Sequence, residues 1–319
     1  MNGNELIELF KKGGKRCHVI GTAENGVIAG LDLEGRLYTV MDGVVVNRVN
    51  PAAVLGITTR TGYLNPGGDG LWPAPEGTCL GYQYGTGNWR VSPGLAGARF
   101  LVMEQTANRA RIEAEIDLVN ASGTGIPAIF SRDVSVAADN NCLTVKVNES
   151  IQYIGAKALN REECLLAPWT LCQFDCGPGC EVVFPATVKT DVWDLYDPSD
   201  DCRCVKDGMV HTRTDSTRRY QIGIGEAVPW IELILPDKKL KIKRSALTLP
   251  EKMSYIDIAD VSPATRPSDK ETRYSVYSDM NGFMEIEAVG GCPPVLNPGV
   301  VLSIEVTTEY RKTERKYEE

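Results

Sequence analysis

Apolar and polar positions alternate along much of the chain with the two-residue period of a β-strand. The clearest case is RARIEAEIDL, residues 109–118, where Ile112, Ala114 and Ile116 share one side and charged residues occupy the other. Such a segment has one buried and one solvated face. Similar runs, separated by turn residues, recur from about residue 16 to about residue 310. We therefore expect an all-β, antiparallel fold.

Local signals refine this picture. Residues 4–12, NELIELFKK, place apolar side chains at helical spacing behind Asn4, so we expect a short N-terminal helix that Asn4 caps. Ala107-Asn108 and Asp139-Asn140-Asn141 separate consecutive strand-like runs, as hairpin turns do. Because no linker interrupts the pattern, residues 1–319 are predicted to form one domain with a charged, frayed C-terminal tail.

Residues 50–97 break the strand pattern. The segment is rich in glycine, proline and asparagine, and it holds the aromatic residues Tyr63, Trp72, Tyr82, Tyr84 and Trp89. A loop of this length inside a compact domain is usually functional or disordered. The aromatic content argues against disorder, so we expect a functional loop.

Within this segment, NPGGDGLWPAPEG at 65–77 concentrates candidate chemistry. A phosphate cradle is disfavoured, because the glycines lack the GxGxxG order and no Lys-Ser/Thr pair follows. A structural turn stays open, since adjacent glycines adopt positive φ readily. A carbohydrate platform also stays open. Asn65, Asp69, Trp72 and Glu76 would supply the amide, the carboxylates and the ring that bind a sugar.

Net charge limits the partners. At −8 the chain lacks the basic balance that contacts with nucleic-acid phosphates require. No run approaches the roughly 18 apolar residues of a membrane-spanning helix, so we expect no membrane partner. The first residues lack the apolar core of an export signal, and we expect a cytoplasmic protein unless an exported precursor has been processed. Nothing in the pattern predicts an oligomeric state.

Ten cysteines raise the question of a metal or a disulfide. Five of them cluster in sequence: Cys172, Cys176, Cys180, Cys202 and Cys204. Their spacings of three residues and of one differ from the usual spacing of structural zinc ligands. A zinc site and a disulfide across the turn at 177–179 are both less favoured than reduced cysteines. We expect free thiols, no metal and no cofactor.

Three segments, in this order, carry a resemblance: NPGGDGLWPAPEG, then LLAPWTLCQFDCGPGCEVVFPA at 165–186, then GFMEIEAVGGCPPVLNPGVVLSIEV at 282–306. Together they resemble galactose-mutarotase-like (aldose epimerase-like) proteins, most closely an uncharacterised bacterial branch with GG-x-x-x-W-x-x-PE and APW motifs. The resemblance covers roughly residues 16–310. It implies an antiparallel β-supersandwich whose concave sheet binds a small carbohydrate or a glycan.

Catalytic chemistry carries over only in part. In aldose epimerases a glutamate takes a proton from the anomeric hydroxyl and a histidine gives one to the ring oxygen. The resemblance places Glu287, in EIEAVGG, in the base position. Glu285 has the same strand parity, so either carboxyl could face the cleft, and both could instead lie on an ordinary surface.

The family's histidines have no counterpart here. Asn65-Pro66 occupies the place of the first, and the LLAPWTL segment contains none. The two histidines of the chain, His18 and His211, lie outside the three motifs. A tyrosine, a buried aspartate or Arg132 could take over the missing acid's role.

Two further residues are candidates for the cleft. Arg132, in FSRDVSV, is either paired structurally or aimed at ligand oxygens, and Trp169 is either a stacking platform or a core residue. We therefore expect a carbohydrate-binding protein whose catalytic status is open. Two further functions stay open: a sugar epimerase or a glycan-processing lyase or hydrolase with Glu287 or Glu76 as general base, and a non-catalytic interaction module.

Overall fold

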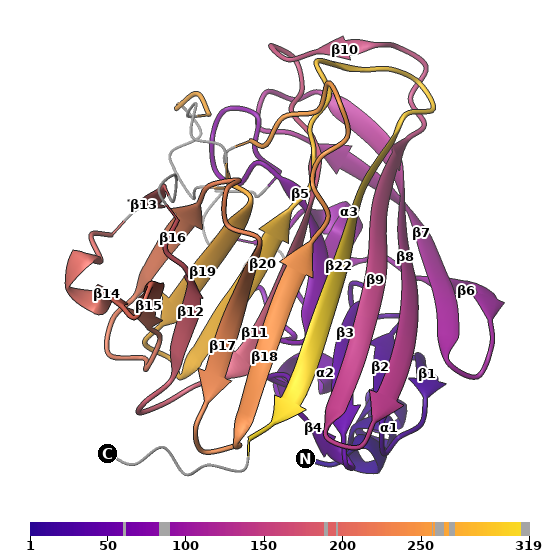
Figure 1. The fold of residues 1–319 in the computed structure, drawn as a ribbon. Coiled ribbons are helices and arrows are strands. Elements are labelled where there is room, and N and C mark those ends of the chain that lie inside the picture. Colours follow the sequence, from indigo (N-terminus) through magenta and orange to yellow (C-terminus); the bar gives the residue numbers. More distant parts are fainter. Residues whose placement is uncertain are drawn as a thin grey trace.

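The computed structural model describes residues 1–59, 62–82, 90–187, 191–195, 197–256, 258, 265–267 and 272–313. Over these residues the chain forms two large antiparallel sheets that face each other (Figure 1). In Figure 1 the sheet containing β22, β9 and β8 lies in front of the sheet containing β20, β11 and β3. The prediction of an all-β antiparallel fold is confirmed.

The first sheet carries the candidate site described below. Its main path runs in the spatial order β1-β2-β3-β5-β11-β20-β19-β16-β13, and β4 pairs with β3. The bounds are β1 (Cys17–Gly21), β2 (Gly26–Gly30), β3 (Arg36–Met41), β4 (Val44–Val45), β5 (Asp69–Ala74), β11 (Ala167–Asp175), β13 (Val192–Asp194), β16 (Tyr220–Ile224), β19 (Tyr274–Asp279) and β20 (Phe283–Val289).

The second sheet covers the first and is built from longer strands. Its order is β14-β15-β12-β17-β18-β22-β9-β8-β7-β6, and a separate pair joins β10 to β21. The bounds are β6 (Leu101–Gln105), β7 (Arg109–Val119), β8 (Gly125–Asp139), β9 (Cys142–Tyr153), β10 (Leu159–Asn160), β12 (Glu181–Pro185), β14 (Arg203–Lys206), β15 (Met209–Arg213), β17 (Trp230–Leu235), β18 (Leu240–Ala246), β21 (Val295–Leu296) and β22 (Val301–Lys312).

Helices are few and short: α1 (Gly3–Lys12), α2 (Pro51–Leu55), α3 (Pro93–Ala96) and the 3₁₀ turn η1 (Asp200–Cys202). The predicted N-terminal helix exists, but Asn2 caps it instead of Asn4. The Asn2 side chain accepts the backbone N–H of Glu5 at 2.8 Å, and the Glu5 carboxylate accepts that of Asn2 at 2.8 Å. This reciprocal capping box satisfies two N–H groups that the helix itself leaves unpaired.

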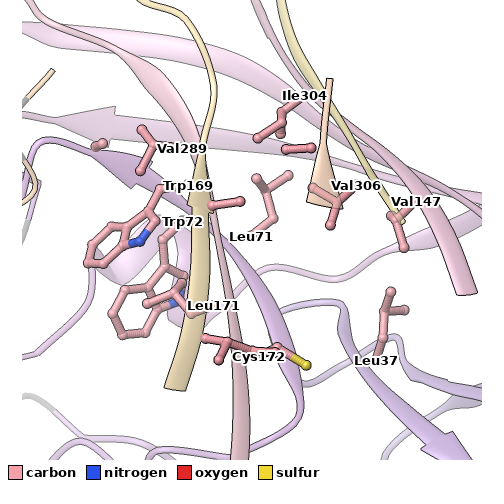
Figure 2. Packing of buried hydrophobic residues seen from close by; sticks show 14 of the residues in the cluster. Leu37, Leu71, Trp72, Val147, Trp169, Leu171, Cys172, Val289, Ile304 and Val306 are labelled. Atoms are coloured by element: carbon pink, nitrogen blue, oxygen red, sulfur yellow. The ribbon is translucent and has the colours of Figure 1, made fainter. Parts of the chain in front are cut away.

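Strand alternation places the core between the sheets. On β7 the expected side, with Ile112, Ala114 and Ile116, is buried. The predicted hairpins join β6 to β7 and β8 to β9. Figure 2 shows the same alternation on β5: Leu71 points toward Ile304 of β22, and the ring of Trp72 lies on the opposite side of the strand. The core therefore uses one face of each sheet and leaves the other face of the first sheet for different side chains.

The segment 50–97 contains a strand that the pattern did not predict. β5 pairs along its length with β11, and Pro73 lies opposite Pro168 in the register. Pro73 and the following Pro75 disguise this strand in the sequence, because neither proline donates a backbone hydrogen bond. Ahead of β5, Gly67 and Gly68 adopt φ of 78° and 71°, so the turn anticipated for this stretch is present.

The remaining expectations on composition have mixed outcomes. All ten cysteines are free thiols. Arg311 and Lys312, which were expected in the charged tail, belong to β22. Residues 314–319 lie outside the described residues, and so do Tyr84 and Trp89 of the segment 50–97. No helix among the described residues is long and apolar enough to cross a membrane.

Candidate functional site

A cavity of about 310 Å³ opens on the face of the first sheet that points away from the second. Its side chains come from β5, β11, β16, β19 and β20, and from residues that flank these strands. The strands adjoin one another in the sheet although they are distant in sequence. Strand pairing therefore assembles one site from segments that span residues 65–287.

Strand parity decides which side chains reach this cavity. On β20, Glu285 and Glu287 line it, and Met284, Ile286 and Ala288 are fully buried on the other side. Because the strands are in register, Gln173 of β11, Glu285 of β20, Tyr277 of β19 and Gln221 of β16 form one row across the sheet. All four side chains point to the same face.

Glu287 is held by donors on both neighbouring sides. The Trp169 indole Nε1 donates to its Oε2 at 3.1 Å, and the Gln221 Nε2 donates to the same oxygen at 3.1 Å. The Gln221 amide also reaches Ser275 Oγ at 3.0 Å. The Glu287 side chain is fully buried. Its orientation in the cavity wall is therefore fixed by hydrogen bonds.

Glu285 and Glu287 interact with each other by a side-chain hydrogen bond. Burial raises the pKa of both carboxyls, and the charge of Glu285 raises the pKa of Glu287 further, to well above its usual range. Gln173 Nε2 donates to Glu285 and partly offsets the cost of burying its charge. A hydrogen bond between two carboxyl groups needs one proton, so this contact and the burial together favour one protonated carboxyl over two adjacent carboxylates.

One side of the cavity, around Tyr277, is aromatic and cationic. Tyr277 donates its hydroxyl to the Asp279 carboxylate, and burial, together with that neighbour, raises the pKa of Tyr277. The Arg219 guanidinium lies 5.7 Å from the centre of the Tyr277 ring and donates to its hydroxyl at 3.3 Å. Phe283 packs at 5.8 Å from the same ring. This end of the cavity offers ring faces and one positive charge.

The tryptophans form the other side of the cavity. Trp72 and Trp169 meet edge to face, with ring centres 5.7 Å apart (Figure 2). They are 3% and 1% exposed, so the Trp169 ring packs as a core residue while its N–H holds Glu287. The Arg36 guanidinium lies 5.1 Å from the Trp72 ring and pairs with Glu34 at 2.9 Å. A buried ion pair thus supports the Trp72 side of the cavity.

Asn65 and Glu76 complete the cavity from either end of β5. The Asn65 carbonyl accepts from Asn50 Nδ2 at 2.8 Å, and its side chain accepts the Gly67 N–H at 3.1 Å. The Glu76 side chain is 7% exposed. The structure therefore brings five of the predicted site residues into one cavity: Asn65, Trp72, Glu76, Trp169 and Glu287.

Asp69 and Arg132 require a correction, because neither lines the cavity. Both point between the sheets, where Arg132 Nη2 lies 2.9 Å from Asp69 and 2.6 Å from Glu149. Arg244 approaches Asp69 from the second sheet at 2.8 Å. Since this cluster pairs two guanidinium groups with two carboxyls, Arg132 takes the structural role that the sequence left open. Asp69 also has a structural role. It lies three residues before Trp72, and an odd separation along a strand places its side chain on the opposite face of β5.

The described histidines also lie away from the cavity lining. His18 belongs to β1, and His211 belongs to β15 of the second sheet, with Nδ1 3.0 Å from the Glu181 carboxylate. Within the described residues, no group of three or more His, Cys, Asp or Glu side chains is arranged to hold a metal ion. The chemistry that the described lining offers is therefore that of carboxyl, amide, guanidinium, phenol and indole groups.

Sequence reasoning missed Gln221, Tyr277, Arg219 and Phe283 as cavity residues. The segment RRYQIGIG was recognised as a strand, but nothing local reveals that β16 lies two strands from β20. Strand parity could have found one supporting residue. Gln173, which donates to Glu285, follows Trp169 by four residues on β11 and therefore lies on the same face of the sheet.

Several solved structures share this architecture. The chain is 12% identical to a galactose mutarotase related enzyme from Lactobacillus acidophilus, with 93% of this chain and 98% of that chain covered and a TM-score of 0.54. A galactose mutarotase-like protein from Clostridium acetobutylicum is 10% identical, with 94% of this chain and 96% of that chain covered and a TM-score of 0.54. A Synechocystis protein is 14% identical, with 93% of this chain and 96% of that chain covered and a TM-score of 0.56. At these identities the likeness shows the fold alone, and it confirms the predicted galactose-mutarotase-like β-sandwich.

Sequence comparison gives the family. No curated protein sequence matches the chain. The model of a family of unknown function, DUF6786, matches residues 65–229, which is more than half of the chain and includes Asn65, Trp72, Trp169 and Gln221 of the cavity. The chain belongs to the DUF6786 family.

Proposed function

We propose that this protein binds a small carbohydrate in the cavity of the first sheet. One observation carries the proposal: a single cavity gathers three carboxyl groups, two amides, a guanidinium and four aromatic rings from five adjacent strands and their flanks. The mutarotase-like fold of the solved structures is consistent with a sugar ligand.

The groups match the chemistry of a polyol. A sugar hydroxyl both donates and accepts, so it can donate to Glu76 or Glu285 and accept from Gln221 or Arg219. Hydrogen bonds to charged groups are stronger than neutral ones. The half-buried rings of Tyr277 and Phe283 offer apolar faces for sugar C–H groups.

Cavity size favours a small ligand. Ligand sites span about 300–1,000 Å³, and about 310 Å³ lies at the lower end of that range. A single sugar ring fits this volume better than a long glycan does. Monosaccharides are therefore the first compounds to test.

Isothermal titration with a panel of neutral mono- and oligosaccharides tests the proposal. We expect at least one monosaccharide to bind with a Kd below about 1 mM. Phe283→Ala, which removes a ring face from the cavity, should weaken that binding about tenfold. Val205→Ala, a truncation at an exposed position on β14, is the matched control and should leave the affinity as it is. Absence of binding across the panel at about 10 mM would count against the proposal.

The carboxyl groups favour a second candidate, a sugar epimerase. Because the pair Glu285–Glu287 holds a proton, Glu287 would donate one to the ring oxygen as the C1–O bond breaks, and Glu76 would take the proton of the anomeric hydroxyl. This role for Glu287 is the reverse of the base role that the family resemblance implies. Faster equilibration of α-glucose or α-galactose in polarimetry, lost in Glu287→Gln, would support it.

The geometry gives less support to an interaction module or to a glycan-cleaving enzyme. An interaction module predicts that side chains close the hollow, whereas a cavity lined by three carboxyl-bearing residues remains on the face of the first sheet. A lyase or hydrolase needs carboxyls placed across a bond between two sugar units, and the small volume favours one unit. Carbohydrate binding is therefore the function that the geometry supports best.

A further inference from the structure

Carboxyl groups outnumber cationic groups in the described lining of the cavity. Glu76, Glu285 and Glu287 line it, and Arg219 is the cation among its described lining residues. A pair Glu285–Glu287 that binds one proton still keeps one negative charge. The described wall around Glu285 and Glu287 is therefore acidic.

The neighbouring cations do not reverse this sign. Arg219 is 43% exposed at its side chain and lies 3.7 Å from the Asp197 carboxylate, which shares its charge. Arg36, behind Trp72, is paired with Glu34 at 2.9 Å. Asp279 adds a further carboxylate beside Tyr277 and raises the pKa of Glu285. Arg48, 4.6 Å from the centre of the Phe283 ring, is paired with Asp175 at 3.0 Å. Each of these three arginines thus has an acidic partner of its own, and the carboxyl pair keeps its negative charge toward the ligand space.

We propose that this arrangement selects uncharged sugars and rejects sugar acids and sugar phosphates, with Glu285 as the specificity-determining residue. The proposal rests on the proposed function, because it names the class of carbohydrate that the same cavity takes. A neutral hydroxyl donates to a carboxylate, whereas a ligand carboxylate or phosphate only accepts. Two like charges a few ångströms apart in a buried wall also repel more strongly than they do in water.

Titration calorimetry with matched pairs tests the selectivity: glucose against glucuronate, galactose against galacturonate, and glucose against glucose 6-phosphate. We expect each neutral sugar that binds to do so at least about tenfold more tightly than its anionic partner. If an anionic sugar binds as tightly as its neutral partner, or more tightly, the selectivity is overturned while carbohydrate binding stands. If none of these sugars binds, both proposals fail.

Substitutions test which residue is responsible, with the ratio of the two affinities as the readout. Glu285→Gln leaves Glu287 as the one carboxyl of the pair, and burial still raises the pKa of Glu287, so the wall becomes less acidic. The new amide keeps an oxygen for the Gln173 donor, and the neutral-to-anionic ratio should fall about tenfold. Arg219→Gln removes the cation of the described lining and should therefore raise the neutral-to-anionic ratio. Glu115→Gln removes an exposed carboxylate from β7 of the second sheet and should leave the ratio unchanged.

Glu76→Gln provides a second route, because Glu76 follows β5 instead of lying on β20. It should also lower the ratio, and it keeps the proposal testable if Glu285→Gln unfolds in a thermal melt. A ratio that stays at the wild-type value in both folded variants would overturn the assignment of selectivity to the carboxyls.

Discussion

At the scale of single residues, the buried hydrogen bonds around Glu287 decide what the cavity wall can do. A buried carboxyl costs several kcal/mol unless its oxygens are satisfied. Trp169 and Gln221 donate to one oxygen of Glu287, and the hydrogen bond with Glu285 favours a protonated carboxyl over a second buried charge. The orientation of this wall is thereby fixed by hydrogen bonds.

Trp169→Phe tests this support. The change keeps an aromatic ring but removes the indole donor at 3.1 Å from Glu287, so we expect a loss of about 1–3 kcal/mol in the free energy of unfolding. Urea unfolding measures it. Trp230→Phe is the control, because Trp230 is half-buried on the second sheet beside Lys243, and it should cost less than about 1 kcal/mol. Equal losses in the two variants would argue that packing, and not the hydrogen bond, explains the effect.

The same scale shows how far sequence reasoning reaches. Glu287 and Trp169 were found through motif resemblance, and the alternation around Glu285 placed both glutamates on one face. Asp69 was misassigned because the prolines at 73 and 75 hid β5, and without a strand there was no parity to separate Asp69 from Trp72. Gln221 and Tyr277 required the order of the strands, which depends on pairing over long sequence distances and leaves no local trace.

At the scale of elements, β5 needs both a tight turn before it and a charged anchor on its inner face. A Cβ at Gly67, where φ is 78°, would lie 2.2 Å from the Arg48 carbonyl oxygen, so only glycine fits this turn. The inner anchor is Asp69, which accepts from Thr170 at 2.9 Å and pairs with arginines of β8 and β18. These contacts hold the first sheet against the second directly behind the cavity.

Gly67→Ala isolates the turn. We expect a loss of more than about 2 kcal/mol in unfolding free energy, since positive φ costs about 1–2 kcal/mol and the clash adds to it. Gly123→Ala is the matched control: φ there is 85°, and a Cβ would meet nothing within 4 Å. The difference between the two variants in chemical denaturation gives the cost of the clash. A Gly67 variant no less stable than the Gly123 variant would contradict this account of the turn.

Asp69→Ala isolates the anchor. Removing one partner from a buried ion cluster leaves Arg132 and Arg244 with less compensation, and we expect a loss of about 3–5 kcal/mol. Asp133→Ala, which breaks an exposed pair with Arg109, should cost less than about 1 kcal/mol. Guanidinium unfolding curves for both variants provide the comparison. Similar small losses would mean that the cluster contributes little to holding the sheets together.

At the scale of the whole molecule, the buried carboxyl pair links stability to pH. The native state keeps a proton on Glu285–Glu287 in a range where the unfolded chain, with ordinary carboxyl pKa values near 4.5, has released it. A native state that binds more protons loses stability as pH rises. Asp69 acts in the opposite sense, because its arginine partners hold its pKa below 3.8, but its effect is confined to more acidic solutions.

Urea unfolding of the wild type and Glu287→Gln, from about pH 5 to about pH 8, measures this linkage. One retained proton corresponds to about 1.4 kcal/mol per pH unit, lost as the pH rises toward the raised pKa of the pair. Glu287→Gln should flatten that slope, because an amide cannot release the proton. Both histidines and every other titratable side chain are common to the two proteins, so the difference between their slopes reports on the pair. If the slopes coincide, the native protein does not retain the proton, and the acid role proposed for Glu287 is wrong.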